Sequence, residues 1–197
     1  VAARRASPDG RRSVFGYFGN LNPWKGAPVL LRAVQRLIAE GRQDFELRLH
    51  GGAPFQAESF VEEVDDLARA VEPHVVRLGP YRREELPALM EAVDWVVMPS
   101  IWWENAPLVI QEAFHHRRPV IASGIGGMAE AVTDGRDGLH VRPDDPVALA
   151  RTMAQAMDEP QLWNRLVESI RPPPTIAETA DRHLRLYGDF DTSAQAA

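Results

Sequence analysis

Two glutamates and one lysine are the residues of this sequence best suited to chemistry on a phosphorylated ligand. Glu104 and Glu112 are separated by seven residues in PSIWWENAPLVIQEAF, residues 99–114. Lys25 lies in another loop, GNLNPWKG, residues 19–26, which also contains two glycines. Glycines let the backbone approach a ligand closely, and a nearby lysine supplies a point charge for a phosphate. A polar turn with a surface lysine is the alternative interpretation of that loop.

The start of a helix expected over 107–116 is a second candidate for anion binding. We expect Asn105 to cap this helix and Pro107 to lie in its first turn. The free N–H groups of the first turn and the helix dipole favour a negative charge there. Glu104 precedes this start and cannot easily share the same place with a phosphate. It is better placed to accept hydrogen bonds from hydroxyl groups of an adjoining part of the ligand.

Glu112 lies more than one turn into the same helix, among residues that are mostly apolar. These neighbours are Leu108, Val109, Ile110, Ala113 and Phe114. A carboxylate in such surroundings is costly to bury without a partner, and two vicinal ribose hydroxyls would satisfy it. The alternative is structural: Glu104 caps its own helix, and Glu112 pairs with Arg117 or His116.

Other polar motifs favour structural roles. Gly124, Gly126 and Gly127 precede a helix and predict a compact turn that needs small residues more than direct ligand contact. His115 and His116 have no carboxylate at metal-ligand spacing and indicate a solvated helix end. The sequence has no Asp-x-Asp element, so no metal site is predicted at a diphosphate.

The elements that must position these residues alternate between strand and helix. Strands are expected over 13–18, 45–50, 75–78, 95–98, 119–122 and 138–141. Helices are expected over 27–40, 60–71, 84–93, 107–116, 128–132, 146–157, 161–170 and 176–190. This alternation predicts an α/β fold with a Rossmann-like parallel sheet of about six strands and helices on both faces. Ligands of such sheets lie beyond the carboxyl ends of the strands. The loops expected there are 19–26, 51–55, 79–83, 99–106 and 123–127.

Composition narrows the class of protein. A chain of 197 residues suits one domain with a sizeable core. A net charge of −6 argues against a nucleic-acid binder. The absence of cysteine removes disulfides, thiolate metal sites and cysteine nucleophiles, and it fits a cytoplasmic protein. No signal peptide opens the chain, and no apolar run reaches the roughly 18 residues that span a bilayer.

Taken together, these motifs resemble the C-terminal domain of the group 1 glycosyltransferases (family GT4), which have the two-domain GT-B fold. The resemblance covers nearly everything from about residue 14 to residue 187. It runs through GNLNPWKG, LHGG, RLGPY, ELPALMEAVDWVVMPS, WENAPLVIQEAF, RPVIASGIGGMAEAV and DGRDGLHVRPDDPVALA.

The resemblance implies a role for each candidate residue. Lys25 matches the lysine that binds the donor's phosphates, and Gly19 matches the glycine that begins that loop. Asn20 stands where many members have an arginine that also contacts phosphate, so one cation is missing here: either Asn20 contributes a hydrogen bond or phosphate binding is weaker. Glu112 matches the glutamate that holds the ribose. Glu104 matches the glutamate that contacts the transferred sugar near the reacting carbon, and we expect it to position the sugar and stabilise charge.

Two backbone segments complete the site implied by the resemblance. The first matches the helix start that contacts sugar and phosphate: Asn105, Ala106, Pro107, Leu108 and Val109. The second, residues 78–81 ending at Tyr81, matches a region whose backbone recognises the base.

The function implied is transfer of a sugar from a nucleotide-diphosphate sugar, with UDP or GDP as the carrier. The resemblance implies retention of anomeric configuration without a metal or other cofactor. The implied partners are the donor, an N-terminal acceptor domain of the same polypeptide, and a glycolipid or polysaccharide acceptor. It implies a cytoplasmic location, peripheral at the inner membrane face through the acceptor domain.

The expected organisation has three parts. Residues 1–12 form a linker or N-terminal remnant, 13–190 the nucleotide-sugar-binding domain, and 191–197 a tail. The first residue is Val rather than Met, so the chain looks like an excised domain. We expect it to bind donor weakly and to show little or no transfer by itself.

Three alternatives remain at this stage. One is a non-catalytic Rossmann-like nucleotide-binding module, which the asparagine at position 20 leaves open. Another is a GT-B relative with different chemistry, such as an epimerase or a phosphorylase. A dehydrogenase is the least favoured, because the first strand lacks the dinucleotide-binding glycine pattern.

Overall fold

The computed structural model describes residues 11–194, with the backbone alone described over 189–194. Its centre is a six-stranded sheet in the order β3-β2-β1-β4-β5-β6, with every neighbouring pair parallel. The strands are β1 (Val14–Phe18), β2 (Glu46–His50), β3 (Val75–Gly79), β4 (Trp95–Met98), β5 (Val120–Ser123) and β6 (Gly138–Val141). The predicted fold class is confirmed, and the strand bounds differ from the predicted ones by one residue at most.

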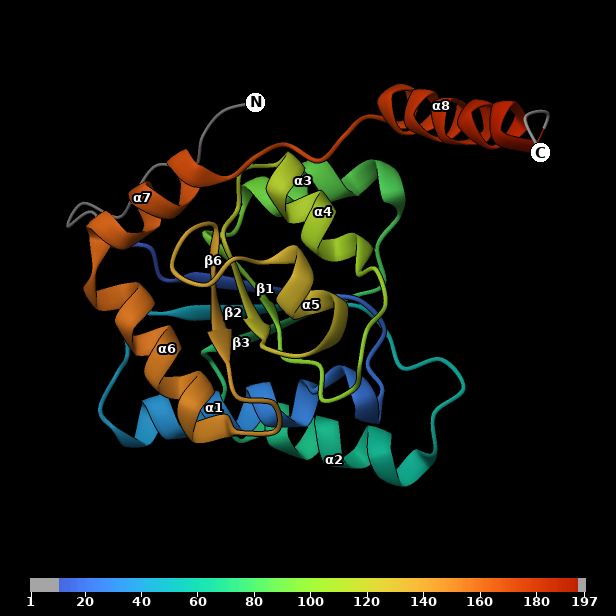
Figure 1. Ribbon diagram of the computed structural model, residues 1–197. Helices are drawn as coiled ribbons and strands as arrows, with labels where there is room; N and C mark the ends of the chain where they lie inside the picture. Colours follow the sequence, from blue (N-terminus) through green and yellow to red (C-terminus); the bar gives the residue numbers. More distant parts are fainter. Residues whose placement is uncertain (1–10, 195–197) are drawn as a thin grey trace.

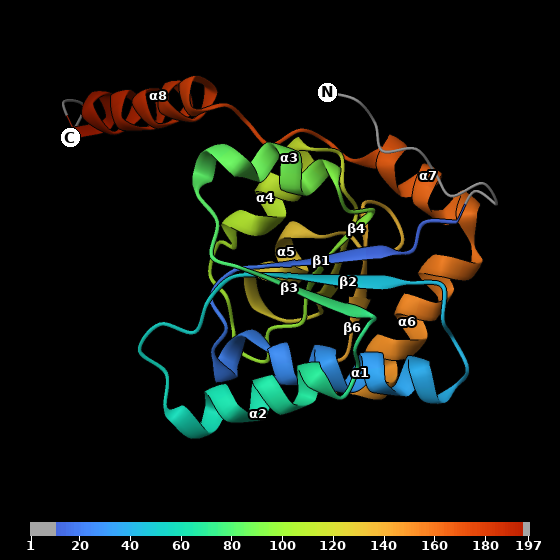
Figure 2. The same ribbon diagram turned by 180° about the vertical axis from the view of Figure 1, so that it is seen from behind.

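Helices cover both faces of the sheet (Figures 1 and 2). One face packs against α1 (Ala27–Ala39), α2 (Glu58–Arg69), α6 (Pro146–Asp158) and α7 (Pro160–Ser169). The other packs against α3 (Leu86–Glu91), α4 (Leu108–His115) and α5 (Gly126–Ala131). Successive side chains of a strand point to opposite faces, so Phe15 belongs to the first core and Val14 to the second. Strands buried on both sides read as apolar runs, as WVVM in β4 does.

The sheet order reverses at its middle. β1 pairs with β2 on one side and with β4 on the other. The loops that leave the carboxyl ends of β1 and β4 therefore diverge to opposite faces and open a crevice between them. The loops that contain Lys25 and Glu104 follow these two strands.

The helix predicted over 84–93 is divided. A short 3-10 helix, η2 (Arg83–Glu85), precedes α3, which begins at Leu86 with Pro87 in its first turn. Proline has no N–H to donate to the carbonyl four residues earlier, and its ring clashes with that carbonyl. The α-helix therefore starts only at Leu86, and Arg83 lies in the connection from β3.

The last helix, α8 (Ile176–Ala194), extends away from the body of the molecule in both views (Figures 1 and 2). Its apolar side chains Ile176, Leu184 and Tyr187 are exposed. No helix within residues 11–194 is long and apolar enough to cross a membrane. The boundaries proposed at residues 12 and 190 stay predictions, and 1–10 and 195–197 lie outside the described residues.

Candidate functional site

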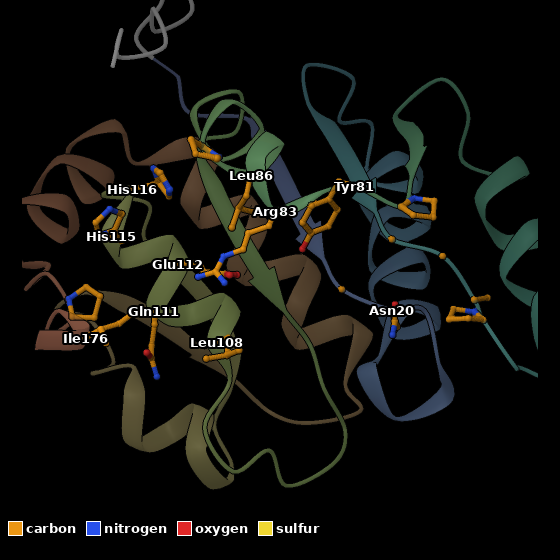
Figure 3. A pocket seen from close by; sticks show the side chains of 18 residues that line it. Asn20, Tyr81, Arg83, Leu86, Leu108, Gln111, Glu112, His115, His116 and Ile176 are labelled. Atoms are coloured by element: carbon orange, nitrogen blue, oxygen red, sulfur yellow. The ribbon is translucent and has the colours of Figure 1, made fainter. Parts of the chain in front are cut away.

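A cavity of about 1260 Å³ lies where loops leave the carboxyl ends of β1, β2 and β3 and face α4. Five of the predicted site residues line it: Gly19, Asn20, Tyr81, Leu108 and Glu112. Figure 3 shows their labelled members around one opening, with Glu112 and Leu108 on the α4 side and Asn20 and Tyr81 opposite. The ligand edge predicted from strand polarity therefore holds a cavity.

The first loop is shaped by its own polar and glycine residues. The Asn22 side chain accepts hydrogen bonds from the backbone N–H groups of Trp24 and Lys25, at 3.0 and 2.9 Å, and caps the 3-10 helix η1 (Pro23–Lys25). Gly26 follows in the left-handed region at φ 73°. A Cβ there would lie 1.9 Å from the Pro99 carbonyl oxygen, so only glycine lets this loop pack against the loop after β4.

That packing brings Lys25 to Glu104. The Lys25 ammonium lies 2.8 Å from Oε1 of Glu104. The Ser100 hydroxyl lies 3.1 Å from the same oxygen and 2.9 Å from the Trp24 carbonyl, so it links the two loops. Two residues 79 positions apart in the sequence thus form one charged pair at the carboxyl edge. Neither Lys25 nor Glu104 is among the residues that line the cavity.

The expected cap of α4 is wrong. The helix begins at Leu108 with Pro107 as its N-cap residue, and no side chain caps it. A residue before proline is disfavoured in the helical region, so Ala106 and Asn105 stay outside the helix. The alternative role of Glu104 as a cap is also excluded, because no side chain caps α4. The loop before α4 packs against the start of α5, where a Cβ on Gly127 would lie 1.8 Å from the Asn105 carbonyl oxygen.

The remaining members of the predicted helix start have different surroundings. Leu108 is an exposed apolar side chain on the cavity wall. Asn105 and Ala106 are exposed, Pro107 is buried and Val109 is half-buried, and none of these four lines the cavity. The expected compact turn at Gly127 is confirmed, since Gly127 also donates its N–H to the Glu104 carbonyl at 2.7 Å.

Glu112 is half-buried on the cavity wall, and its carboxylate makes no hydrogen bond or ion pair within the described part of the chain. Burial raises the pKa of this carboxyl, and the charge of Arg83 partly opposes that rise. The alternative pairing with Arg117 is wrong, because the Arg117 guanidinium donates to the Ile170 carbonyl at 3.2 Å. His116 does not pair with the carboxylate either. Glu112 thus presents to the cavity a carboxylate that no described group of the chain engages.

An aromatic cluster lies beneath Tyr81. The rings of Phe18 and His50 stack at 4.6 Å, and the Tyr81 ring meets each of them edge-on. Burial, with a smaller contribution from Arg48, lowers the pKa of His50 to about 4, so the imidazole is neutral at pH 7. His50 Nε2 is buried without a hydrogen-bond partner in the described structure. The sequence interpretation missed His50, although the motif LHGG places it at the carboxyl end of a strand.

Other residues of the cavity were also missed. Arg83 lies on its wall, and His115 and His116, expected at a solvated helix end, line it too. The spacing along α4 could have predicted His115, because Gln111, Glu112 and His115 share one face of that helix at intervals of three and four residues. Beside the ion pair, Trp24 and Trp102 are exposed with ring centroids 5.4 Å apart. Within the described residues, no group of three or more His, Asp or Glu side chains could hold a metal ion.

Comparison with known proteins decides the family. The model of the family described as "Glycosyl transferases group 1" matches residues 12–159. The chain belongs to the group 1 glycosyltransferases. Its fold agrees with that membership, and the resemblance inferred from the motifs is confirmed.

Curated group 1 relatives are longer than this chain. A D-inositol 3-phosphate glycosyltransferase of Corynebacterium diphtheriae is 34% identical over 182 residues, which are 89% of this chain and 42% of the relative. An alpha-D-kanosaminyltransferase of Streptomyces kanamyceticus is 28% identical over 91% of this chain and 46% of the relative. The chain therefore spans less than half the length of these transferases.

Solved structures show the same partial coverage. The Anabaena protein HepE, solved in complex with UDP and glucose, matches with a TM-score of 0.73 at 28% identity, over 84% of this chain and 47% of HepE. A sucrose-phosphate synthase from Thermosynechococcus elongatus matches with a TM-score of 0.78 at 25% identity, over 93% and 47%. This group 1 domain corresponds to the C-terminal half of GT-B glycosyltransferases.

Proposed function

We propose that this domain holds the nucleotide-sugar donor of a retaining, metal-independent glycosyltransferase. The observation that carries the proposal is the unpartnered carboxylate of Glu112 in the cavity, at the same edge of the sheet as the Lys25–Glu104 ion pair. This carboxylate is half-buried, and its oxygens are acceptors open to a ligand in the cavity. Two vicinal ribose hydroxyls would supply the missing donors.

The first turns of α4 then set the direction of the donor. Leu108 and Glu112 are four residues apart, about 6 Å along the axis at 1.5 Å per residue. We place the 5′ phosphate of a ribose held at Glu112 toward the helix start, because the free N–H groups and dipole there favour an anion. Further toward that end the diphosphate would approach Lys25, and the sugar would approach Glu104.

Lys25 and the helix start would stabilise the charge that develops on the departing diphosphate, as a metal ion does in other transferases. Lys25 now pairs with Glu104, so binding of the diphosphate would share or replace that contact. Glu104 would then be free to orient the sugar and to stabilise positive charge at the reacting carbon. The acceptor would attack from the face that the diphosphate leaves, which retains configuration.

The donor carrier we propose is UDP or GDP, and the structure of HepE with UDP supports UDP first. No cofactor is needed in this scheme. The acceptor site would belong to an N-terminal domain of the same polypeptide, since the relatives are more than twice as long. We propose a glycolipid or polysaccharide acceptor and a cytoplasmic location at the inner membrane face. The isolated chain would bind donor but transfer little or none of it.

Isothermal titration of UDP, GDP and ADP into the chain tests the proposal. We expect one diphosphate to bind, Lys25→Ala and Glu112→Gln each to weaken it, and the matched exposed variant Glu62→Gln to leave it unchanged. Diphosphate binding that ignores both site variants would refute the assignment. In an enzyme with both halves, Glu104→Ala should abolish turnover. Unchanged turnover there would favour the non-catalytic nucleotide-binding module.

A further inference from the structure

The loop proposed to bind phosphate, residues 19–26, contains one cationic side chain, Lys25, and the inference drawn from this rests on the proposed function. Asn20 lines the cavity from the same loop, and its amide has no charge to give a phosphate. Lys25 in the same loop is held by Glu104 at 2.8 Å. The first loop therefore does not neutralise both negative charges of a diphosphate ligand.

Arg83 is the cation that faces the cavity from the opposite side. It lies in η2, directly after the loop from β3, and its side chain is exposed on the cavity wall. Figure 3 shows the Arg83 guanidinium extending between Tyr81 and Glu112 toward α4. Its charge is close enough to lower the pKa of Glu112 against the effect of burial. Within the described residues, however, Arg83 forms no ion pair with Glu112 or with another acid.

Its neighbour Arg82 is used differently. The Arg82 backbone N–H donates to Glu85 at 2.7 Å, and its guanidinium lies 3.4 Å from the same carboxylate. Arg82 therefore closes the first turn of η2 and does not line the cavity. Arg82 thus stabilises the local backbone, whereas Arg83 faces the cavity.

We infer that Arg83 binds the donor's α-phosphate, the one next to the ribose, and supplies the charge that Asn20 does not. Glu112 would take the ribose hydroxyls, and the guanidinium across from it would reach the phosphate joined to the ribose 5′ carbon. A planar guanidinium donates two parallel N–H bonds to phosphate oxygens, which a neutral side chain cannot do.

A second role for Arg83 predicts a different pattern. If Arg83 only lowers the proton affinity of Glu112, it supports the ribose contact, and its loss should weaken nucleosides and nucleotides alike. If it binds phosphate, its loss should weaken nucleotides and spare nucleosides. The number of phosphates on the probe therefore separates the two roles.

The experiment titrates the 197-residue chain with uridine, UMP and UDP, and with guanosine, GMP and GDP, by chemical-shift perturbation. We expect Arg83→Met to weaken the nucleoside mono- and diphosphate of the preferred base by about 10- to 100-fold, as loss of a charge-assisted hydrogen bond does. The nucleoside should bind as before. Arg83→Lys should restore part of the loss, and Arg82→Met, the matched control, should change none of these affinities. Raising the salt concentration should weaken UMP less in Arg83→Met than in the parent chain.

Each other outcome overturns the inference. Equal weakening of nucleoside and nucleotide would reduce Arg83 to a supporter of Glu112. Unchanged nucleotide affinity in Arg83→Met, with normal binding by the parent chain, would remove Arg83 from the site but leave the proposed function standing. Failure of the parent chain to bind any of the six probes would refute both. A thermal melt of each variant excludes misfolding. We expect every variant to fold, because Arg82 and Arg83 are both exposed.

Discussion

The two ends of the sheet differ in how fully the chain pairs their polar side chains. At the amino ends, buried Asp94 accepts a hydrogen bond from the Val14 N–H at 3.0 Å, and Arg12 lies 3.7 Å from it. Arg118, also buried, donates to the carbonyls of Met90 and Glu91. At the carboxyl ends, Glu112 has no partner among the described residues and a buried nitrogen of His50 has none.

This difference indicates what each end is for. Burying a polar group without a partner destabilises a fold, so natural structures satisfy most of them. The amino end meets that demand within the chain and joins β1, β4 and α7, where the Arg12 guanidinium also lies 4.1 Å from the Trp163 ring centroid. At the carboxyl end, buried His50 Nε2 and half-buried Glu112 have no partner among the described residues, and Glu112 lines the cavity. Four substitutions test that contrast.

The largest expected effect is at the amino end. Asp94→Ala would leave the Val14 N–H and the Arg12 charge without their buried acceptor. We expect the free energy of unfolding in urea to fall by about 3–5 kcal/mol, as it does when one partner of a buried ion pair is removed. Nucleotide affinity of the folded protein should not change. A loss below about 1 kcal/mol would contradict the view that this end is held by its charges.

Gly26→Ala should disturb both stability and the carboxyl end. The new Cβ would meet the Pro99 carbonyl oxygen at 1.9 Å, and the residue would have to keep φ 73°. We expect a loss of about 1–3 kcal/mol and weaker nucleotide binding, because the loop that carries Lys25 must move. The matched variant Gly41→Ala, also at positive φ but with open space around its Cβ, should lose stability without losing affinity. Equal effects on affinity would break the link between loop packing and the site.

Glu112→Gln should separate stability from binding. The folded state raises the pKa of this carboxyl, so its ionisation opposes folding above the unfolded-state pKa of about 4.3. The variant should therefore be slightly more stable than the parent at pH 7, with the difference vanishing as pH falls below that range. Nucleotide affinity should fall by about 10-fold or more. Lower stability at pH 7 would mean that Glu112 has a structural partner after all.

His50→Phe should have the smallest effect at pH 7. The pKa of His50 is lowered from 6.5 to about 4, so the parent loses stability as pH falls from 6.5 toward 4, where the unfolded chain takes up the proton first. The variant should lack this part of the pH dependence and be up to about 1 kcal/mol more stable at pH 7, because an unpartnered nitrogen is removed. Denaturation at pH 5 and pH 7 measures it. Identical pH profiles would show that the fold does not lower the pKa of His50.

Most of the fold could be predicted because it depends on local signals. Apolar runs such as WVVM and the helical spacing of Ala27–Ala39 specify the elements, and parallel crossovers then limit the topology. The placement of Lys25 and Glu104 at the same edge of the sheet followed from strand polarity, whereas their ion pair was not predicted. The start of α4 was misjudged because Asn105 was weighed as a cap without the restriction that Pro107 places on Ala106.

The missed residues depend on contacts that no single motif contains. Arg83 reaches the cavity because Pro87 delays the start of α3 and leaves η2 over α4. His50 matters only through its stacking on Phe18 and its lack of a partner, which burial in the sheet determines. The positions of Arg83 and His50 depend on how helices and strands pack, so a motif in the sequence does not predict them.

One measurement tests most directly the claim that the carboxyl end is the donor site. Amide chemical shifts of the chain are recorded while UDP, or GDP if UDP does not bind, is added. The account predicts perturbations in the loops 19–26 and 79–83 and at the start of α4, with the amides before β1, β2 and β4 unmoved. Perturbations centred on the amino ends of the strands, or none with either nucleotide, would contradict it.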